Sequence, residues 1–292
     1  MKGVILTAGN ATRLRPITNV YGKVLVPIYD KPMIEYGVSL LLKCGIREIA
    51  IVCNPSDLPN YKRLFDNKFE KYGVHFELFI QKQALGTAHA LKPAAKFVGD
   101  DEFVVLFGDN IFVMDNMDKL LTKAIQKNTG VTLFAKRVPD PQRFGIIEHD
   151  KNFNIVDLQE KPLAPKTNLA ATGLYVFEAG CMQKIFKIKK SVRGEYELND
   201  LITEYIKNKK AKVNILDDSC RWLDTGTFDA LLNCSQLVKD FEEKHGLFGS
   251  IELELYRQKI ITKTELNELC KIYRSDYTSR MEQTIKLWKN KK

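Results

Sequence analysis

Short apolar runs alternate with amphipathic stretches through the first half of the chain. Consecutive or alternating apolar residues predict buried strands at 3–6, 48–53, 75–80, 103–107 and 131–136. An apolar face predicts a helix at 32–45, and further helices are predicted at 84–98 and near 117–127, with a polar helix around 56–68. Pro32 suits a first helical position, and Pro93 predicts an interruption of the third helix. This alternation predicts parallel strands joined by helical crossovers, with ligands at the carboxyl ends of the strands.

The pattern changes near residue 137. Short strands between turns are predicted for FGIIEH, FNIVDL and LAATGLYVF, then a helix, then further strands in AKVNILD and CRWLDTG. Nearly the whole chain from 227 to 292 has helical periodicity. We therefore expect one α/β body over 1–226, with a distinct region at about 137–226, followed by a helical C-terminal extension over 227–292.

Composition indicates an ordinary soluble protein. The 292 residues are 45% hydrophobic and 28% charged, and no stretch approaches the ~20 apolar residues of a transmembrane helix. Met1-Lys2-Gly3 leads into the first strand without signal-peptide features, so we expect a cytoplasmic protein with no membrane partner. Six cysteines lie without a Cys-x-x-Cys pair, which argues against a disulfide framework or a zinc knuckle.

The formal net charge of +9 favours anionic partners. Nucleic acid and anionic small substrates would both suit this balance. The sequence contains neither a zinc finger nor an arginine run with interleaved aromatic residues. We therefore expect no nucleic-acid partner, and most of the lysines are expected on solvated faces.

The segment VILTAGNATRLRP (4–16) leads from the first strand into a loop that contains Gly9. Backbone N–H groups in a tight turn after a strand form an anion-binding concavity, and Arg13 adds positive charge. The loop lacks both G-x-x-x-x-G-K-[ST] and G-x-G-x-x-G, so neither a Walker loop nor a dinucleotide fingerprint is supported. Lys23 follows in a stretch that could return it to the same pocket. The alternative is an ordinary polar connection.

Two aspartates each follow a predicted strand, Asp109 in LFGDNIF and Asp224 in WLDTGT. Carboxylates at this position can hold Mg²⁺, which takes one or two protein carboxylates together with phosphate oxygens and waters. Either residue alone also fits an Asx turn or a helix cap. Together with the cationic loop, they predict a metal-bridged phosphate site.

Two other charged segments are weaker indications of a binding site. LQEKP and SVRGEYELND place Glu160, Lys161 and Arg193 in apolar surroundings, although each also fits a solvated turn. His89 is predicted to be structural. No Ser-His-Asp or Cys-His arrangement is indicated.

Several segments together carry a family resemblance: GKVLVPIYDKPMIEY, LFGDNIF, RFGIIE, LQEKPLAPKTNLAATGLYVF, RGEYELNDLI and WLDTGT. In this order they resemble the sugar-1-phosphate nucleotidylyltransferases, especially the glucose-1-phosphate thymidylyltransferases, over essentially the whole chain. The resemblance implies a Rossmann-like, mostly parallel nucleotidyltransferase sheet with an inserted sugar-binding region. It also implies a helical end that packs between the subunits of a homodimer or homotetramer.

The resemblance also implies roles for individual residues. Arg13 and Lys23 would be catalytic and hold the nucleotide phosphates, and Asp109 and Asp224 would ligate Mg²⁺. The nucleotide would be bound by Leu6, Ala8, Gly9, Asn10, Ala11, Thr12, Gln81 and Gly86, the last two where the family contacts the pyrimidine. The sugar 1-phosphate would be bound by Gly145, Glu160, Lys161, Thr172 and Arg193.

Departures from the family pattern lie in the first loop. Members usually have G-G-x-G-T-R, whereas this chain has Ala8 and Ala11 at two of the glycines, and Gly22 where serine is usual. A positive φ at Ala11 would cost roughly 1–2 kcal/mol. We expect Asn10, which tolerates left-handed geometry, to absorb that strain.

The implied activity is Mg²⁺-dependent transfer of a nucleotidyl group from dTTP to glucose 1-phosphate, giving dTDP-glucose and pyrophosphate. Two alternatives stay open. One keeps the chemistry with UTP or another sugar 1-phosphate, as QKQALGTAHAL resembles uridylyltransferases. The other is a nucleotide-sugar-binding protein with weak turnover.

Overall fold

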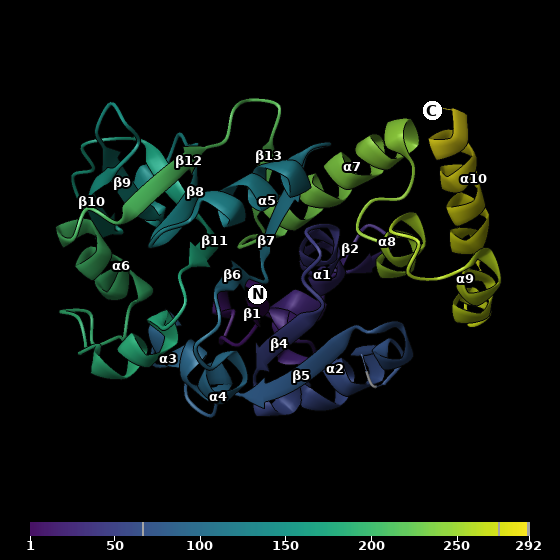
Figure 1. The fold of residues 1–292 in the computed structure, drawn as a ribbon, viewed down its shortest axis with the longest axis horizontal. Coiled ribbons are helices and arrows are strands. Elements are labelled where there is room, and N and C mark those ends of the chain that lie inside the picture. Colours follow the sequence, from purple (N-terminus) through teal and green to yellow (C-terminus); the bar gives the residue numbers. More distant parts are fainter. Residues whose placement is uncertain (66, 274, 291–292) are drawn as a thin grey trace.

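The computed structural model describes residues 1–65, 67–273 and 275–290 (Figure 1). Its strands are β1 (Lys2–Leu6), β2 (Pro27–Ile28), β3 (Lys31–Pro32), β4 (Glu48–Cys53), β5 (His75–Ile80), β6 (Phe103–Phe107), β7 (Asn110–Val113), β8 (Val131–Arg137), β9 (Gly145–His149), β10 (Ile155–Glu160), β11 (Leu169–Phe177), β12 (Ala211–Ile215) and β13 (Arg221–Asp224). Its α-helices are α1 (Ile34–Lys43), α2 (Leu58–Phe65), α3 (Thr87–Leu91), α4 (Ala95–Val98), α5 (Met117–Lys127), α6 (Leu198–Lys207), α7 (Phe228–His245), α8 (Ile251–Arg257), α9 (Lys263–Cys270) and α10 (Asp276–Asn290).

A nine-stranded sheet has the order β10-β9-β11-β6-β1-β4-β5, with β8 beside β11 and β12 beside β8. The neighbours β5, β4, β1 and β6 are parallel. Alternate residues of β1 face two cores, because side chains alternate along a strand. Ile5 packs in the core that includes α1 and the C-terminal helices, and Val4 packs in the core that includes α3 and α6. Helices therefore cover both faces of the parallel strands, which explains their continuous apolar runs.

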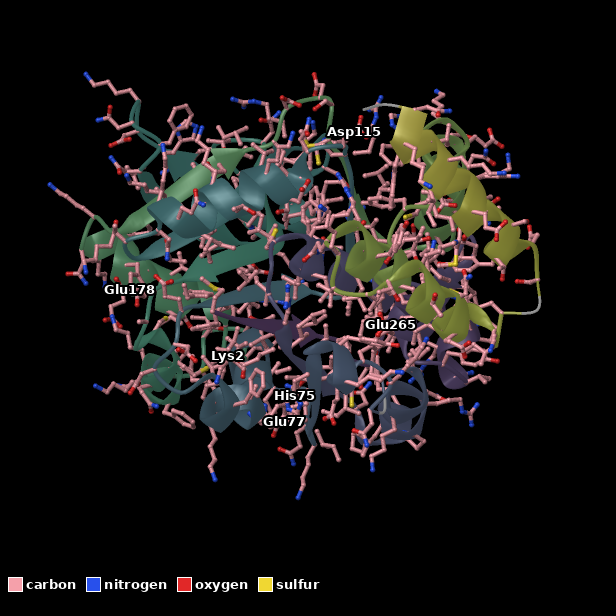
Figure 2. All side chains as sticks on the ribbon, turned by 45° about the vertical axis from the view of Figure 1, so that its right-hand side comes forward. Lys2, His75, Glu77, Asp115, Glu178 and Glu265 are labelled. Carbon is pink, nitrogen blue, oxygen red and sulfur yellow. The ribbon has the colours of Figure 1, made fainter. Side chains whose placement is uncertain are left out.

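The edge of the sheet at β5 carries charged side chains. This strand pairs with β4 on one side only in the observed order. His75 and Glu77 lie together on the outside of the molecule, about half exposed (Figure 2). Charged side chains on an edge strand oppose pairing with another chain.

The predicted strand and helix series is confirmed, with three differences. A strand that was not predicted, β7, pairs with β13 outside the nine-stranded sheet. Pro32 does not open a helix: Lys31 and Pro32 pair with Ile28 and Pro27 in a short hairpin, and α1 begins at Ile34. β8 is not hydrogen-bonded to the parallel strands, because β11 lies between β6 and β8 and is antiparallel to both. The interruption near Pro93 is confirmed, since a 3₁₀ turn at Lys92–Ala94 separates α3 from α4.

The C-terminal part is helical, as its periodicity predicts. Helices α7 to α10 lie on the side of α1, at the right of Figure 1. Residues 274, 291 and 292 of the predicted extension lie outside the described residues, as does residue 66 of the helix predicted at 56–68. None of the helices that the structure describes is both long and apolar enough to cross a membrane. All six cysteines are free thiols, and five of them are buried.

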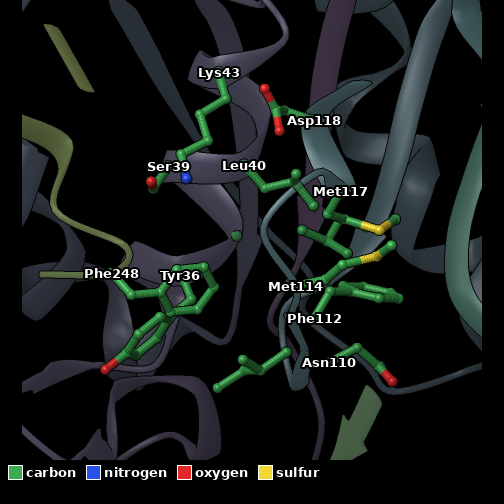
Figure 3. A pocket seen from close by; sticks show the side chains of 13 residues that line it. Tyr36, Ser39, Leu40, Lys43, Asn110, Phe112, Met114, Met117, Asp118 and Phe248 are labelled. Carbon is green, nitrogen blue, oxygen red and sulfur yellow. The ribbon is translucent and has the colours of Figure 1, made fainter. Parts of the chain in front are cut away.

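A small cavity lies between α1, β7 and the start of α5 (Figure 3). Its volume is about 20 Å³, and its lining includes Leu40, Phe112 and Met117. A volume of this size holds about one water molecule. This cavity is therefore a packing feature and not a substrate site.

Candidate active site

Three charged side chains meet beyond the carboxyl ends of β6 and β13. Antiparallel pairing of β7 with β13 places Asp224 opposite Asn110, the residue next to Asp109. The Thr225 hydroxyl donates to the backbone oxygen of Asp109 at 3.0 Å, which fixes the two segments together. Nζ of Lys23 lies 2.6 Å from Oδ2 of Asp109 and 3.6 Å from Oδ1 of Asp224. Two carboxylates that are far apart in the sequence thus share one cation.

Two guanidinium groups add positive charge beside Asp224. An ideal Cβ at Gly226 would lie 3.1 Å from Nη2 of Arg13 and 3.3 Å from each carboxylate oxygen of Asp224. Glycine at this position therefore leaves room for both side chains. Nη2 of Arg143 lies 3.5 Å from Oδ2 of Asp224. The site combines two carboxylates with three cationic side chains, an arrangement suited to phosphate oxygens and a metal.

A cavity of about 350 Å³ opens next to this cluster. Nine of the predicted site residues line it: Leu6, Ala8, Gly9, Ala11, Arg13, Lys23, Gln81, Gly86 and Asp109. Asn10 and Thr12 belong to the same loop but are not among the lining residues. The cavity is thus lined by the cationic loop, by Lys23 and Asp109, and by Gln81 and Gly86, whereas Asp224 is not among its lining residues.

The first loop has a left-handed residue at Ala11. Its φ and ψ are 42° and 40°, so the strain foreseen for alanine is present. The expectation that Asn10 takes up the left-handed geometry is wrong, since Asn10 has no positive φ. The reason is that Ala11 begins the 3₁₀ turn Thr12–Leu14, and its carbonyl accepts from Leu14 N at 3.0 Å and from the Thr18 hydroxyl at 2.9 Å.

Two polar residues after β4 connect the loop to the turn that carries Lys23. Oδ1 of Asn54 accepts from Gly9 N at 3.2 Å, and Nδ2 donates to the Gly9 carbonyl at 3.0 Å and to Oδ2 of Asp57 at 3.2 Å. Oδ1 of the buried Asp57 accepts from Gly22 N at 3.1 Å. A Cβ at Gly22 would lie 2.3 Å from this carboxylate, which explains glycine before Lys23.

The part of the cavity wall at Gly86 depends on a close backbone approach. Its φ is 113°, and a Cβ there would lie 2.5 Å from the carbonyl oxygen of Tyr196. Tyr196 N donates to the Leu85 carbonyl at 2.8 Å, and Ala88 N donates to the Tyr196 carbonyl at 2.9 Å. This approach joins the loop before α3 to the segment before α6, and glycine is required for it.

The predicted sugar-phosphate residues form a second cluster. Nη1 of Arg193 lies 3.6 Å from Oε1 of Glu160 and 3.3 Å from Oε1 of Glu197, and Nζ of Lys161 lies 3.8 Å from Oε1 of Glu160. Oε2 of Glu160 accepts from Asn199 Nδ2 at 2.8 Å. Burial raises the pKa of Glu160, against the opposing effect of the Lys161 ammonium. Four charged groups and one amide thus form a compact polar cluster.

Gly145 and Thr172 differ in their relation to this cluster. A Cβ at Gly145 would lie 3.2 Å from Oε2 of Glu160, so glycine keeps space open beside the carboxylate. Thr172 is fully buried, and its hydroxyl donates to the Phe134 carbonyl at 2.9 Å. The structure therefore places Gly145 beside Glu160. The buried Thr172 hydroxyl instead bonds from β11 to the backbone of β8.

The aspartate pair fits magnesium in its donor chemistry. Within residues 1–65, 67–273 and 275–290, no group of three or more His, Cys, Asp or Glu side chains is arranged to hold a metal. Mg²⁺ prefers oxygen ligands and uses one or two carboxylates, leaving its other positions to phosphate oxygens and waters. Asp109 and Asp224 provide two such carboxylates, already facing the positive charge of Lys23.

The comparisons with known proteins cover most of the chain. The family model described as nucleotidyl transferase matches residues 2–240. The chain belongs to the nucleotidyl transferase family. A glucose-1-phosphate thymidylyltransferase of Neisseria gonorrhoeae is 36% identical to it, over 93% of this chain and 94% of that protein. One from Mycobacterium tuberculosis strain H37Rv is 37% identical, over 87% of this chain and 88% of that protein.

Solved structures show the same fold. A Bacillus anthracis protein described as a glucose-1-phosphate thymidylyltransferase, in complex with a sucrose, superimposes with a TM-score of 0.73 and 35% identity. The match covers 82% of this chain and 96% of that chain. A UDP-glucose pyrophosphorylase complexed with UDP-glucose has the same TM-score at 23% identity, covering 82% and 98%, and shares the fold. The resemblance inferred from the sequence and the predicted α/β fold class are both confirmed.

Sequence reasoning missed five polar residues around the site: Asn54, Asp57, Arg143, Glu197 and Asn199. Asn54 and Asp57 lie in NPSD, which has the composition of a helix start, so nothing local indicated a contact with Gly9 or Gly22. Arg143 precedes FGIIE, and its position next to the predicted strand was the available signal. Each of these contacts depends on tertiary structure.

Proposed function

We propose that the protein transfers a nucleotidyl group from dTTP to glucose 1-phosphate, giving dTDP-glucose and pyrophosphate. A phosphate oxygen of glucose 1-phosphate attacks the α-phosphorus, and the bond from that phosphorus to the bridging oxygen of pyrophosphate breaks. The observation that carries the proposal is Lys23 between Asp109 and Asp224, next to a cavity that Lys23 and Asp109 line, in a member of the nucleotidyl transferase family. The named relatives support the choice of substrates.

The side chains of the site act by position and charge. Both reactants are polyanions, so their approach requires neutralisation of phosphate charge. Arg13 and Lys23 line the cavity and supply that charge, and the backbone of Ala8 to Ala11 shapes the wall for the triphosphate. No covalent enzyme intermediate is required, because holding the attacking oxygen in line with the leaving group lowers the barrier directly.

Asp109 and Asp224 would hold the magnesium ion. When bound, Mg²⁺ supplies Lewis-acid stabilisation of phosphoryl oxygens. The two carboxylates also orient the Lys23 ammonium, since both of them face it.

The second polar cluster is proposed as the sugar 1-phosphate site. Arg193 and Lys161 would bind the phosphate, and Glu160 would accept hydrogen bonds from sugar hydroxyls. Gly145 leaves space for the sugar beside Glu160. Backbone hydrogen bonds of Tyr196 to Leu85 and Ala88, on either side of Gly86, join the wall of the proposed nucleotide cavity to the segment that carries Arg193. This connection supports a shared active site.

We also propose that the protein is a homo-oligomer assembled through its helical end. Phe228 and Leu232, one helical turn apart in α7, are 47% and 70% exposed. Two large apolar side chains on one exposed helix face favour an interface. Light scattering should give the mass of a dimer or tetramer, and Leu232→Glu should lower it.

A triphosphate-by-sugar activity matrix tests the proposal. Purified protein is incubated with Mg²⁺, each of dTTP, UTP, CTP, ATP and GTP, and each of several sugar 1-phosphates, and pyrophosphate is measured. The highest kcat/KM is expected with dTTP and glucose 1-phosphate. A maximum with UTP or another sugar would assign the alternative substrate. Tight nucleotide binding without pyrophosphate release from any mixture would identify a binding protein instead.

A further inference from the structure

Gln81 is a buried amide on the wall of the cavity. It follows β5, its backbone N donates to the Cys53 carbonyl at 2.9 Å, and its side chain lines the cavity at 5% exposure. A primary amide has a donor end and an acceptor end of nearly the same shape. What it recognises therefore depends on which end faces the ligand.

The imidazole ring of His89 contacts the amide nitrogen of the Gln81 side chain. Nε2 of Gln81 lies 3.3 Å from Nδ1 of His89. An amide nitrogen only donates, so Nδ1 accepts, and the ring is neutral with its proton on Nε2. Burial, followed by the nearby Lys92 ammonium, lowers the pKa of His89, against a smaller opposing effect of a hydrogen bond with the Gln83 backbone. The neutral ring that the contact requires is thus the form that the surroundings favour.

The ring of His89 is itself held in place. It stacks on Tyr196 with a centroid distance of 6.0 Å, and Nζ of Lys92 lies 4.6 Å from the centroid of the same tyrosine ring. The Tyr196 backbone bonds to Leu85 and Ala88 on either side of Gly86. His89 is not among the residues that line the cavity, so it acts through Gln81.

We propose that His89 is a positioning residue that fixes the Gln81 amide so that Oε1 is left to accept from the nucleotide base. The proposal rests on the nucleotidyl transfer proposed above. Uracil and thymine present an N3–H donor between two carbonyls, whereas cytosine has a lone pair on N3. An acceptor at this point binds the first two bases and opposes the third. Sites that hydrogen-bond a polar group discriminate strongly against an analogue that cannot supply it.

The test measures kcat/KM for dTTP, UTP and CTP in His89→Phe and His89→Asn. Phenylalanine keeps an aromatic ring against Tyr196 and removes the acceptor, whereas asparagine restores an acceptor near the position of Nδ1. We expect His89→Phe to lower the ratio of dTTP to CTP activity about tenfold or more, and His89→Asn to recover much of it. His149→Phe is the matched control, because His149, at the end of β9, also stacks on an aromatic ring, that of Phe153 at 5.5 Å, and is not among the residues that line the cavity.

The outcomes separate this inference from the proposed function. An unchanged ratio of dTTP to CTP activity in an active His89→Phe variant would overturn the role of His89 and leave the reaction intact. Absence of pyrophosphate release from the wild-type protein with every triphosphate would instead remove the function on which it rests.

A second measurement needs no substitution. Long-range ¹⁵N–¹H correlation on the ¹⁵N-labelled protein distinguishes protonated from unprotonated imidazole nitrogens. We expect His89 Nδ1 to be unprotonated and Nε2 to be protonated at neutral pH. A proton on Nδ1 would make that nitrogen a donor, turn the Gln81 amide around and contradict the proposal.

Discussion

Ala11→Gly should stabilise the protein, although glycine usually does the opposite. Ala11 has φ 42° and ψ 40°, a conformation that costs an L-residue with a Cβ about 1–2 kcal/mol. Glycine removes this cost, but its greater backbone freedom stabilises the unfolded chain by about 0.4–1 kcal/mol. The net gain is about 1 kcal/mol, which for a chain of this size is roughly 2–4 °C in Tm.

Ala8→Gly is the matched control in the same loop. Ala8 also lines the cavity, but it has no positive φ. Glycine there relieves no strain, so we expect a loss of about 0.4–1 kcal/mol. Differential scanning calorimetry of the two variants and the wild type measures the opposite shifts directly. Equal destabilisation by both substitutions would refute the assignment of strain to Ala11.

Activity provides an independent readout of the same variant. The backbone of the loop is held by the hydrogen bonds that the Ala11 carbonyl accepts from Leu14 and Thr18, and glycine retains both. Pyrophosphate release by Ala11→Gly should therefore be at least as fast as that of the wild type. A large loss of kcat/KM with a raised Tm would show that the methyl group itself contributes to the site.

Three further predictions concern Gly22, the buried carboxyl group of Glu35, and the two arginines near Asp224. Gly22→Ala should displace the Asp57 carboxylate, lower the free energy of unfolding by about 1–3 kcal/mol and raise KM for the triphosphate; an unchanged Tm would show that the turn adapts. Burial and the Glu252 carboxylate raise the pKa of Glu35 to about 8, so folding favours its protonated form and stability falls as pH rises from about 4.5 to 8. Tm measured at pH 5, 6.5 and 8 should decline less in Glu35→Gln than in the wild type, and parallel curves would contradict this linkage. Arg13→Ala should lower kcat/KM about a hundredfold or more. Arg143→Ala should cost less than tenfold, since Arg13 lines the cavity and Arg143 is not among its lining residues, and equal losses in steady-state kinetics would refute this ranking.

Local patterns predicted the elements better than their arrangement. The apolar runs of β1, β4 and β6 identify buried strands because both faces are covered, and these strands pair as parallel neighbours. The position of β11 between β6 and β8 could not be inferred, because a buried antiparallel strand has the same apolar run as a parallel one. Pro32 suited a helix start equally well, and only its pairing with Pro27 shows a strand.

The active site shows the same contrast: single residues could be predicted from local patterns, but their contacts could not. Asp109 could be located from its place after a strand, and its meeting with Asp224 depends on the pairing of β7 with β13, which no local pattern specifies. His89 was predicted to be structural, and its contact with Gln81 appears only once the loop before α3 is folded against Tyr196. The left-handed residue was expected near Ala11, but the choice between Asn10 and Ala11 required the backbone.

The most direct test of the active site is the steady-state kcat for pyrophosphate release in Asp109→Asn, Asp224→Asn and the double variant. Two carboxylates that serve one centre act as a unit, so their effects should not multiply. We expect each single variant to lose about a hundredfold or more in kcat, and the double variant to be within a few-fold of the weaker single variant. Near-wild-type turnover in either single variant, or losses that multiply in the double variant, would contradict a shared centre formed by Asp109, Asp224 and Lys23.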